Sequence, residues 1–482
     1  MAKFTTDYVN LIANNLRDRY KTGFPVLKEL VQNADDAGAT SLTFGYHKGH
    51  GDAVDHQLLA GPALWVLNNG RFTAQDRQAI MSFGLNSKAA ESGAIGKFGL
   101  GMKSVFHLCE AFFYVASDGN QNFEEILSPW FEDTGSNDMH RRWEEISQRG
   151  LKALNATAAE FLAGRENKSW FMLWVPLRLK THVPQVEGQL TAPIIDRFPG
   201  DDIGGDLDLF TEPDIERRVG KLLPLLRNLQ RISFVGTDLL PAFDLKVELH
   251  EGSQRLDHVT DGLQARGSVA DSSPMGSRLH FVATQTVKAD VAPFNRLQAS
   301  DRWPKSNAIV EDGRRAPVPD KAQPEGAVVF SHADKRRGHL TLQWAVFLPT
   351  EEGRYRYEAH IPDSSREYSV TLHGQFFVDA GRRGIDGMEL LAEPAADESR
   401  QTTEASVHLA WNQALAQHLA LPAVLPGLAN YVEVAALSDL QVTALTDALV
   451  RCATAGDSDA KITFVQAYLR HLCSQLLNHE QN

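Results

Sequence analysis

Apolar and polar positions in the first 180 residues follow helical spacing in some segments and strand spacing in others. Apolar residues three and four positions apart predict helices over residues 6–20, 28–40 and 74–82. Buried-strand patterns are expected over four segments, 42–46, 62–67, 112–116 and 170–179. A charged segment before the last of these strands, residues 124–165, is expected to be irregular. The mixture of elements fits an α+β fold class.

The rest of the chain divides into a second mixed region and a helical one. A stretch rich in proline, glycine and aspartate, residues 192–208, is the best candidate for a domain boundary. The elements expected after it are a helix over 214–229 and strands over 231–235, 245–249, 327–331, 340–348 and 368–378. Residues 250–325 are expected to be rich in loops, and helices are expected over 435–452 and 464–477. We therefore predict domains over residues 1–195 and 209–390, the second of them α/β, and a helical segment over 391–482.

The composition excludes several classes of protein. With 482 residues, of which 43% are hydrophobic, the chain can form ordinary cores in two or three domains. The net charge of -13 argues against a surface that coats nucleic acid. The three cysteines are too few for a disulfide or zinc framework, which fits reduced thiols. No apolar run of about 18 residues and no signal-peptide core occur, so we expect a cytoplasmic protein without a membrane partner, or the front part of a longer one.

The segment 28–40 has two chemically different faces if it is helical. At roughly 100° per residue, Glu29, Asn33 and Asp36 fall within about 60° of one another. The opposite face is apolar and consists of Leu27, Leu30, Val31 and Ala34. Gly38 then supplies the residue type that favours a left-handed helix end. The polar face fits either a solvated surface or a binding site.

A glycine-rich segment near residue 100 has the composition of a phosphate-binding loop. Gly96, Gly99 and Gly101 precede a stretch with helical spacing, residues 102–108. Bare backbone amides at the positive end of a helix dipole can bind phosphate. A G-x-x-G-x-G run alone fits tight turns and close packing equally well, so its meaning depends on the neighbouring motifs.

The order of these motifs resembles the GHKL ATPase superfamily, which is shared by gyrase, the ninety-kilodalton heat-shock chaperones, sensor histidine kinases and mismatch-repair MutL. The matching segments are KELVQNADDAGAT, ALWVLNNGRFTAQD, NSK and GAIGKFGLGMKSVFHL, followed by ILSPW, VPLRL and HGQFFVDAGRRGID. Within the superfamily the chain is most similar to the sacsin-type branch. The resemblance implies an N-terminal two-layer α/β sandwich, the Bergerat ATP-binding fold, with a lid at about residues 71–100. It also implies ATP and Mg²⁺ as cofactors and a second domain of the middle or transducer type.

The resemblance assigns roles to the polar face of the first motif. Glu29 corresponds to the general base that polarises the attacking water. Asn33 would supply a neutral oxygen to Mg²⁺, which keeps several waters and bridges phosphate oxygens. Asp36 would support the nucleotide near the ribose or through water, or else it is a helix-end carboxylate that binds nearby backbone.

Further residues are implied on the adenine and phosphate sides. Asn68, before Gly70, stands where the chaperones carry the aspartate that receives the adenine amino group, and its amide oxygen can still accept that bond. Ser169 and Trp170 stand where the superfamily has a glycine followed by a threonine, so the resemblance assigns them no role. Lys88, in the lid, fits a phosphate contact and a solvated surface lysine equally well. The residues implied around the phosphates are Gly96, Lys97, Phe98, Gly99, Gly101 and Met102, with Ser87 and Lys88 in the lid.

The resemblance leaves two functions open. Arg382 and Arg383 are candidates for the arginine that stabilises the transferring phosphate, although two arginines in a turn are equally typical of plain surface charge. One hypothesis is a slow, Mg²⁺-dependent ATP hydrolase with a chaperone-like or assembly role. It would bind ATP and ADP and an unknown protein client, and a homodimer is a candidate assembly. The other is a nucleotide-binding sensor or scaffold with little or no hydrolysis. The sequence does not indicate nucleic acid as a partner.

Overall fold

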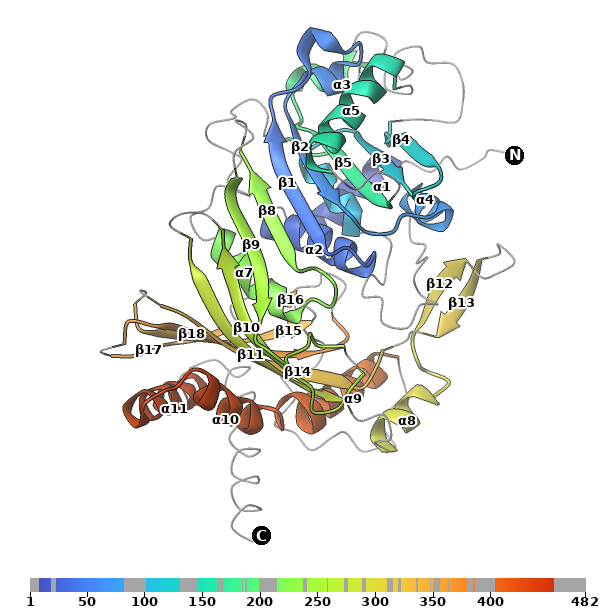
Figure 1. Ribbon diagram of the computed structural model, residues 1–482. Coiled ribbons are helices and arrows are strands. Elements are labelled where there is room, and N and C mark those ends of the chain that lie inside the picture. Colours follow the sequence, from blue (N-terminus) through green and yellow to red (C-terminus); the bar gives the residue numbers. More distant parts are fainter. Residues whose placement is uncertain are drawn as a thin grey trace. The chain divides into compact units, whose positions relative to one another are not determined.

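The chain forms two compact units of mixed secondary structure. The computed structural model describes residues 8–18, 23–81, 101–130, 146–162, 168–183, 185–186, 189–198, 215–236, 241–257, 259–272, 276–287, 292–309, 315–319, 322–334, 337–346, 348–349, 356–362, 364–378, 385 and 404–454 (Figure 1). Unit 1 comprises Met1–Lys88, Gly96–Glu216 and Asn228–Asp244. Unit 2 comprises Ala89–Ile95, Arg217–Arg227 and Leu245–Asn482.

Unit 1 contains short helices and a mixed sheet. Its described helices are α1 (Tyr8–Asp18), α2 (Phe24–Asp36), η1 (Gly51–Ala53), α3 (Gln57–Ala60), α4 (Ala74–Met81), η2 (Gly101–His107), α5 (Gln148–Phe161) and η4 (Lys180–His182). Its described strands are β1 (Ser41–His47), β2 (Ala63–Asn68), β3 (Phe112–Ser117), β4 (Asn122–Leu127), β5 (Trp170–Pro176), β6 (Gln185–Val186), β7 (Gln189–Leu190) and β8 (Arg231–Val235). The strand order β8-β1-β2-β5-β3-β4 makes β1 and β8 parallel and the other described neighbours antiparallel.

One apolar cluster of unit 1 covers one face of this sheet. Trp65 and Leu67 of β2 and Trp174 of β5 belong to a buried cluster that also takes in Leu154 of α5. Successive side chains of a strand point to opposite faces, so Asn68, next to Leu67, lies on the other face. The sheet thus separates the apolar cluster from the end of β2 that carries the predicted polar residue.

Unit 2 contains a series of mostly sheet-forming strands and the C-terminal helices. Its described strands are β9 (Pro241–Leu249), which begins in unit 1, β10 (Gln264–Asp271), β11 (Arg278–Val287), β12 (Lys305–Ile309), β13 (Arg315–Pro319), β14 (Glu325–Ala333), β15 (His339–Val346), β16 (Leu348–Pro349), β17 (Arg356–His360) and β18 (Glu367–Gly374). Its described helices are α7 (Ile215–Leu222), which also begins in unit 1, η5 (Leu223–Leu225), α8 (Ala292–Gln298), α9 (Glu404–Leu415), the π-helical turn η9 (Ala416–Ala420), α10 (Val424–Val434) and α11 (Asp439–Thr454). The sheet order is β9-β10-β11-β14-β18-β15-β16, and β17 pairs with β15.

The C-terminal helices cover the sheet of unit 2. Helix α10 packs on β11 and β14, and α11 packs on β15 and β17. Gly427 brings α10 close to the sheet, because a Cβ there would lie 2.6 Å from Val328. Trp344 of β15 and Trp411 of α9 are fully buried in the resulting core. The apolar residues of α10 and α11 recur every three or four positions because one side of each helix is buried against the sheet.

The α+β class, the strands and the C-terminal helices agree with the sequence analysis, while two expectations were wrong. Residues 124–165 are not irregular throughout, because β4 and α5 lie partly or wholly there. The edge strand β4 buries Phe123 and exposes Glu124, so its charges concealed a strand. Residues 250–325 hold β10, β11, α8, β12 and β13 rather than mainly loops. The expected helix over 464–477 lies outside the described residues.

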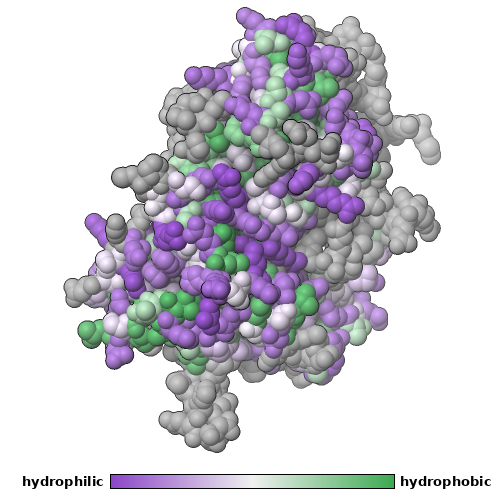
Figure 2. Space-filling view, viewed as in Figure 1, coloured by the Kyte–Doolittle hydropathy of each residue, from purple (hydrophilic) through white to green (hydrophobic). Residues whose placement is uncertain are grey.

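Polar side chains dominate the face of the molecule that is visible in Figure 2. Figure 2 shows a largely hydrophilic face with a small hydrophobic area over α11, where Leu440 is 83% and Val450 is 41% exposed. In the part of the chain that the structure describes, none of the helices has the length and hydropathy needed to cross a membrane.

Candidate functional site

Helix α2 is anchored by its apolar side. Leu27 and Val31 are fully buried, whereas Glu29, Asn33 and Asp36 are each half-buried. The helical spacing predicts this partition, because residues three and four positions apart share a face. The two carboxylates and the amide therefore share the partly accessible side of one rigid element.

The C-terminal end of α2 is a Schellman motif. Gly38 has a φ of 72°. Its backbone N–H donates to the carbonyl of Asp35 at 2.9 Å, and the N–H of Ala39 donates to the carbonyl of Ala34 at 3.0 Å. The predicted left-handed end at Gly38 is confirmed, and it turns the chain from α2 into β1.

Asp35 is a buried anchor that the sequence analysis missed. It is 1% exposed, and its Oδ1 accepts hydrogen bonds from the backbone N–H groups of Asn228 and Leu229, both at 2.8 Å. These two residues lead into β8, the parallel neighbour of β1. The signal was present in the spacing, since Asp35 continues the series Leu27, Val31 along the apolar side. A charge at such a position must find partners inside the protein.

The turn after β2 contacts the end of α2. Asn68 is 9% exposed, and its Oδ1 accepts a hydrogen bond from the N–H of Gly70 at 2.9 Å. The N–H of Arg71 donates to the carbonyl of Ala37 at 2.8 Å. A Cβ on Gly70 would lie 2.9 Å from the Cβ of Ala37, so glycine is required for this approach. The structure thus brings two of the predicted motifs into direct contact.

Ser169 binds the same turn. Its hydroxyl oxygen accepts a hydrogen bond from the N–H of Phe72 at 3.1 Å. The hydroxyl proton is donated to the carbonyl of Gly70 or of Ser117, each 3.0 Å away. Ser169 therefore provides a hydroxyl group beside the turn, in the segment where the superfamily resemblance implies a threonine.

The described end of the glycine segment lies against α2. Helix η2 begins at Gly101 and packs against α2, but it is a 3₁₀ helix, which is tighter than an α-helix. Met102 is half-buried, and Lys103 is only 6% exposed. Burial lowers the pKa of Lys103 to about 8. Lys103, which the sequence motifs did not single out, stands next to the segment predicted to bind phosphates.

Arg178, also missed, holds the end of η2. It is 1% exposed and forms a buried ion pair with Glu110. Its guanidinium also donates to the carbonyls of Phe106, Cys109 and His107, at 2.5, 2.7 and 2.9 Å. Carbonyls at a helix end lack partners within the helix, and the five donors of arginine can satisfy several at once. The arginine of the VPLRL segment therefore fixes the position of η2.

Some of the predicted site residues lie outside the described residues. They are Ser87, Lys88, Gly96, Lys97, Phe98, Gly99, Arg382 and Arg383. The roles implied for them in the lid, the phosphate loop and the second domain remain predictions.

The donor set on α2 fits a hard divalent cation. Mg²⁺ binds oxygen ligands and takes only one or two from a protein when phosphates supply others. Glu29, Asn33 and Asp36 offer carboxylate and amide oxygens on one half-buried face. The half-buried position leaves that face partly accessible, so Asn33 can serve as the protein ligand that the resemblance implies.

Comparison with known proteins places these motifs in one recognised region. Residues 5–150 match the family model of the Sacsin domain. This region includes α2, the turn after β2 and η2. Human sacsin (Homo sapiens) is 38% identical to the chain over 111 residues. That alignment covers 22% of this chain and 2% of sacsin, so the chain spans only a small part of the relative that it matches.

Proposed function

We propose that unit 1 binds ATP with Mg²⁺ and hydrolyses it slowly, as a Bergerat-fold site of the sacsin-type branch of the GHKL superfamily. One observation carries the proposal: α2 meets both the turn after β2 and η2, so three motifs far apart in sequence converge. The match to the Sacsin domain covers the same three elements. Nucleotide-dependent closure would then serve a chaperone-like or assembly role with a protein client.

Glu29 would act as the general base. Its carboxylate accepts a proton from the water that attacks the terminal phosphate. A base must be aimed from a rigid element, and α2 is fixed by its buried apolar side and by the bonds of Asp35. Binding alone does not need a carboxylate here, so Glu29 is the residue that separates hydrolysis from binding.

Asn33 and Asn68 would orient the nucleotide at its two ends. Asn33 would hold Mg²⁺, which when bound offsets the negative charge of the phosphates. Asn68 would accept a hydrogen bond from the adenine amino group. Its Oδ1 already accepts the N–H of Gly70, but an amide oxygen has two lone pairs. Ser169 would hold the turn that carries Asn68 in place.

The identity of Asn68 also favours a second candidate function, a nucleotide sensor with little or no turnover. A neutral amide accepts a hydrogen bond less strongly than a carboxylate does. Weaker adenine recognition would suit a module that reports nucleotide concentration. The two candidates differ in turnover, not in the position of the site.

Calorimetric titration of the full chain with ATP, ADP and GTP, with and without Mg²⁺, tests the site. We expect ATP and ADP to bind more tightly than GTP, and Mg²⁺ to strengthen ATP binding. Asn33→Ala should remove the Mg²⁺ effect. Absence of binding by all three nucleotides would refute the proposed function.

Turnover by a Glu29→Gln variant tests the base. Loss of a positioned general base costs at least about a hundredfold in rate, while nucleotide binding should be retained. Glu251→Gln, at an exposed turn in unit 2, is the matched control and should turn over ATP like the parent. Equal rates in Glu29→Gln and the parent would remove Glu29 from the chemistry. Binding without turnover in the parent would select the sensor function.

A further inference from the structure

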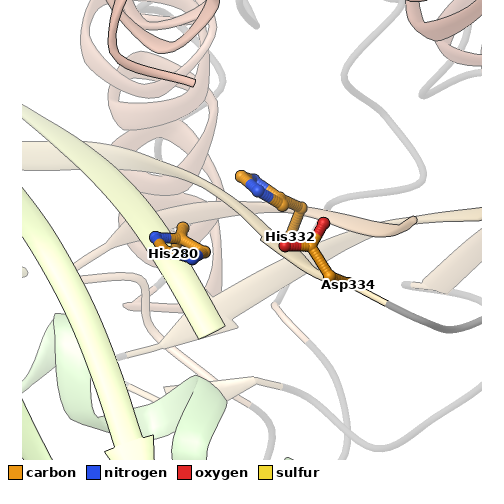
Figure 3. A group of neighbouring side chains, drawn as sticks. All are labelled: His280, His332 and Asp334. Atoms are coloured by element: carbon orange, nitrogen blue, oxygen red, sulfur yellow. The ribbon is translucent and has the colours of Figure 1, made fainter. Parts of the chain in front are cut away.

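A second group of ionisable side chains lies in unit 2, on the sheet formed by β11 and β14. His280 and His332 are directly paired across these antiparallel strands, so they project from the same face. Asp334 follows His332 by two positions, and the alternation of extended chain places it on that face as well. Figure 3 shows the three side chains together where β11 runs beside the end of β14.

The distances among these side chains suit a metal ion. One ligand atom from each of the three lies within 4.8 Å of the others. The imidazole rings are stacked, with 5.0 Å between centroids and 20° between planes. Nitrogen and oxygen ligands about 2 Å from a zinc ion are roughly 3.3 Å from one another in a tetrahedron. The ligand atoms must therefore move closer together than they are here. Rotation of the side chains can achieve this, because Asp334 is exposed and His280 is half-buried.

One ring nitrogen of His332 already has a buried hydrogen-bond partner. Its Nδ1 lies 2.6 Å from the hydroxyl oxygen of Tyr431. His332 is 3% exposed and Tyr431 is 1% exposed, so the bond fixes the ring in place. If the Nδ1 proton is donated to Tyr431, the lone pair of Nε2 is the one that can coordinate a cation. Helix α10, which carries Tyr431, thus orients the histidine.

The charges around the group decide which ions it can hold. Burial, with smaller effects from Arg366 and His280, lowers the pKa of His332 to about 4, and burial also lowers the pKa of His280. Burial thus favours the neutral form of each ring, which is the form that coordinates a metal ion. Arg366 Nε lies 2.9 Å from Oδ1 of Asp334 and opposes a cation. Only an ion with strong affinity for imidazole would overcome that repulsion.

We propose that His280, His332 and Asp334 bind one divalent transition-metal ion, with Zn²⁺ as the best match to their chemistry. Two imidazoles and a carboxylate suit Zn²⁺ better than Mg²⁺ or Ca²⁺, which prefer oxygen. Three protein ligands leave a fourth position open for water or a small ligand. A cavity of about 170 Å³, lined also by His250, lies at this position. This site is independent of the nucleotide and lies on other residues.

The test is Zn²⁺ binding by the full chain, freed of metal with a chelator and carrying no histidine tag. Competition with a chromophoric chelator should give one tight Zn²⁺ per chain, and millimolar Mg²⁺ should not displace it. Co²⁺ as a substitute ion should give visible absorption bands that Zn²⁺ removes. His280→Ala and Asp334→Asn should each weaken Zn²⁺ binding at least about tenfold. Loss of an outer-shell partner already costs about that much, and loss of a direct ligand should cost no less.

His360→Ala is the control for loss of a histidine, since His360 is exposed on β17 in the same unit. It should bind Zn²⁺ like the parent chain. Without metal, each variant should unfold at the same temperature as the parent. Zn²⁺ should raise the unfolding temperature only in proteins that keep His280, His332 and Asp334. No tight Zn²⁺ binding, or binding that both variants leave unchanged, would show that the stacked histidines and the Arg366–Asp334 pair serve structure alone.

Discussion

Arg178 and Glu110 form an ion pair in which both side chains are completely buried. The pair joins the chain just after β5 to the chain just after η2. Glu110 is also bonded by the indole N–H of Trp130 at 2.9 Å. Burying two charges is costly, and such a pair is retained only where further hydrogen bonds satisfy both groups. Here Arg178 also donates to the carbonyls of Phe106 and His107 in η2, so the pair positions the proposed phosphate side of the site.

Replacing Arg178 by methionine should therefore destabilise unit 1 strongly. The change leaves the Glu110 carboxylate buried without its partner, which costs about 3–5 kcal/mol. Urea unfolding measures the loss. Arg149→Met is the control, because the Arg149–Asp55 pair is exposed and such pairs contribute at most about 1 kcal/mol. Similar losses in both variants would mean that the buried pair has no special role.

The neighbours Asp35 and Asp36 should respond differently to the same substitution. Asp35→Ala leaves the buried N–H of Leu229 and the more exposed N–H of Asn228 without an acceptor, at a cost of about 1–3 kcal/mol in the free energy of unfolding. Asp36→Ala should change stability by less than about 1 kcal/mol, since Asp36 is half-buried, and should weaken ATP binding instead. Urea unfolding and calorimetry on both variants separate the two effects. The assignment fails if Asp36→Ala is the less stable protein.

The local features of α2 could be predicted from the sequence. Burial follows the helical period, so the separation of Glu29 and Asn33 from Leu27 and Val31 needed no knowledge of the fold. The end at Gly38 was equally local, because glycine tolerates a positive φ. Motif order then indicated which distant segments belong to one site.

Long-range partners could not be predicted in this way. Asp35 bonds to Leu229, 194 positions later, and no periodicity names a partner at that distance. The pairing of His280 with His332 depends on the register of β11 and β14. A shift of one residue in that register would move every side chain of the strand to the opposite face of the sheet. Arg178 belonged to a sequence motif, but only the folded structure shows which carbonyls it binds.

Gly70→Ala should disrupt the contact between the turn after β2 and α2. The new methyl group would lie 2.9 Å from the Cβ of Ala37 and 3.0 Å from Oδ1 of Asn68. Overpacking of this kind costs about 1–3 kcal/mol, and a displaced Asn68 should weaken ATP binding. Gly220→Ala, in α7, is the control, because its nearest contact would be 3.8 Å away. Helix propensity predicts that this control gains about 0.5–1 kcal/mol, so unfolding data should show opposite signs.

The stability of unit 1 should fall as the pH decreases from 6.5 towards 4. The ring of His47 packs against Trp174 at 5.0 Å between centroids, and burial, followed by the charge of His50, lowers the pKa of His47 to about 4. In the unfolded chain a histidine titrates near pH 6.5. Between these values the unfolded chain binds a proton that the folded protein does not, so the free energy of unfolding decreases with falling pH and this loss ends near pH 4.

A His47→Asn variant isolates this effect. The amide oxygen of asparagine can accept the hydrogen bond that Nδ1 of His47 accepts from the N–H of Gly49 at 2.9 Å, but asparagine does not titrate. Urea unfolding between pH 6.5 and 5, with a chelator present, should show a smaller slope with pH than in the parent. The slope should not vanish, because burial also lowers the pKa of His50. His360→Asn should keep the parental slope, and an equal reduction there would assign the pH dependence to other groups.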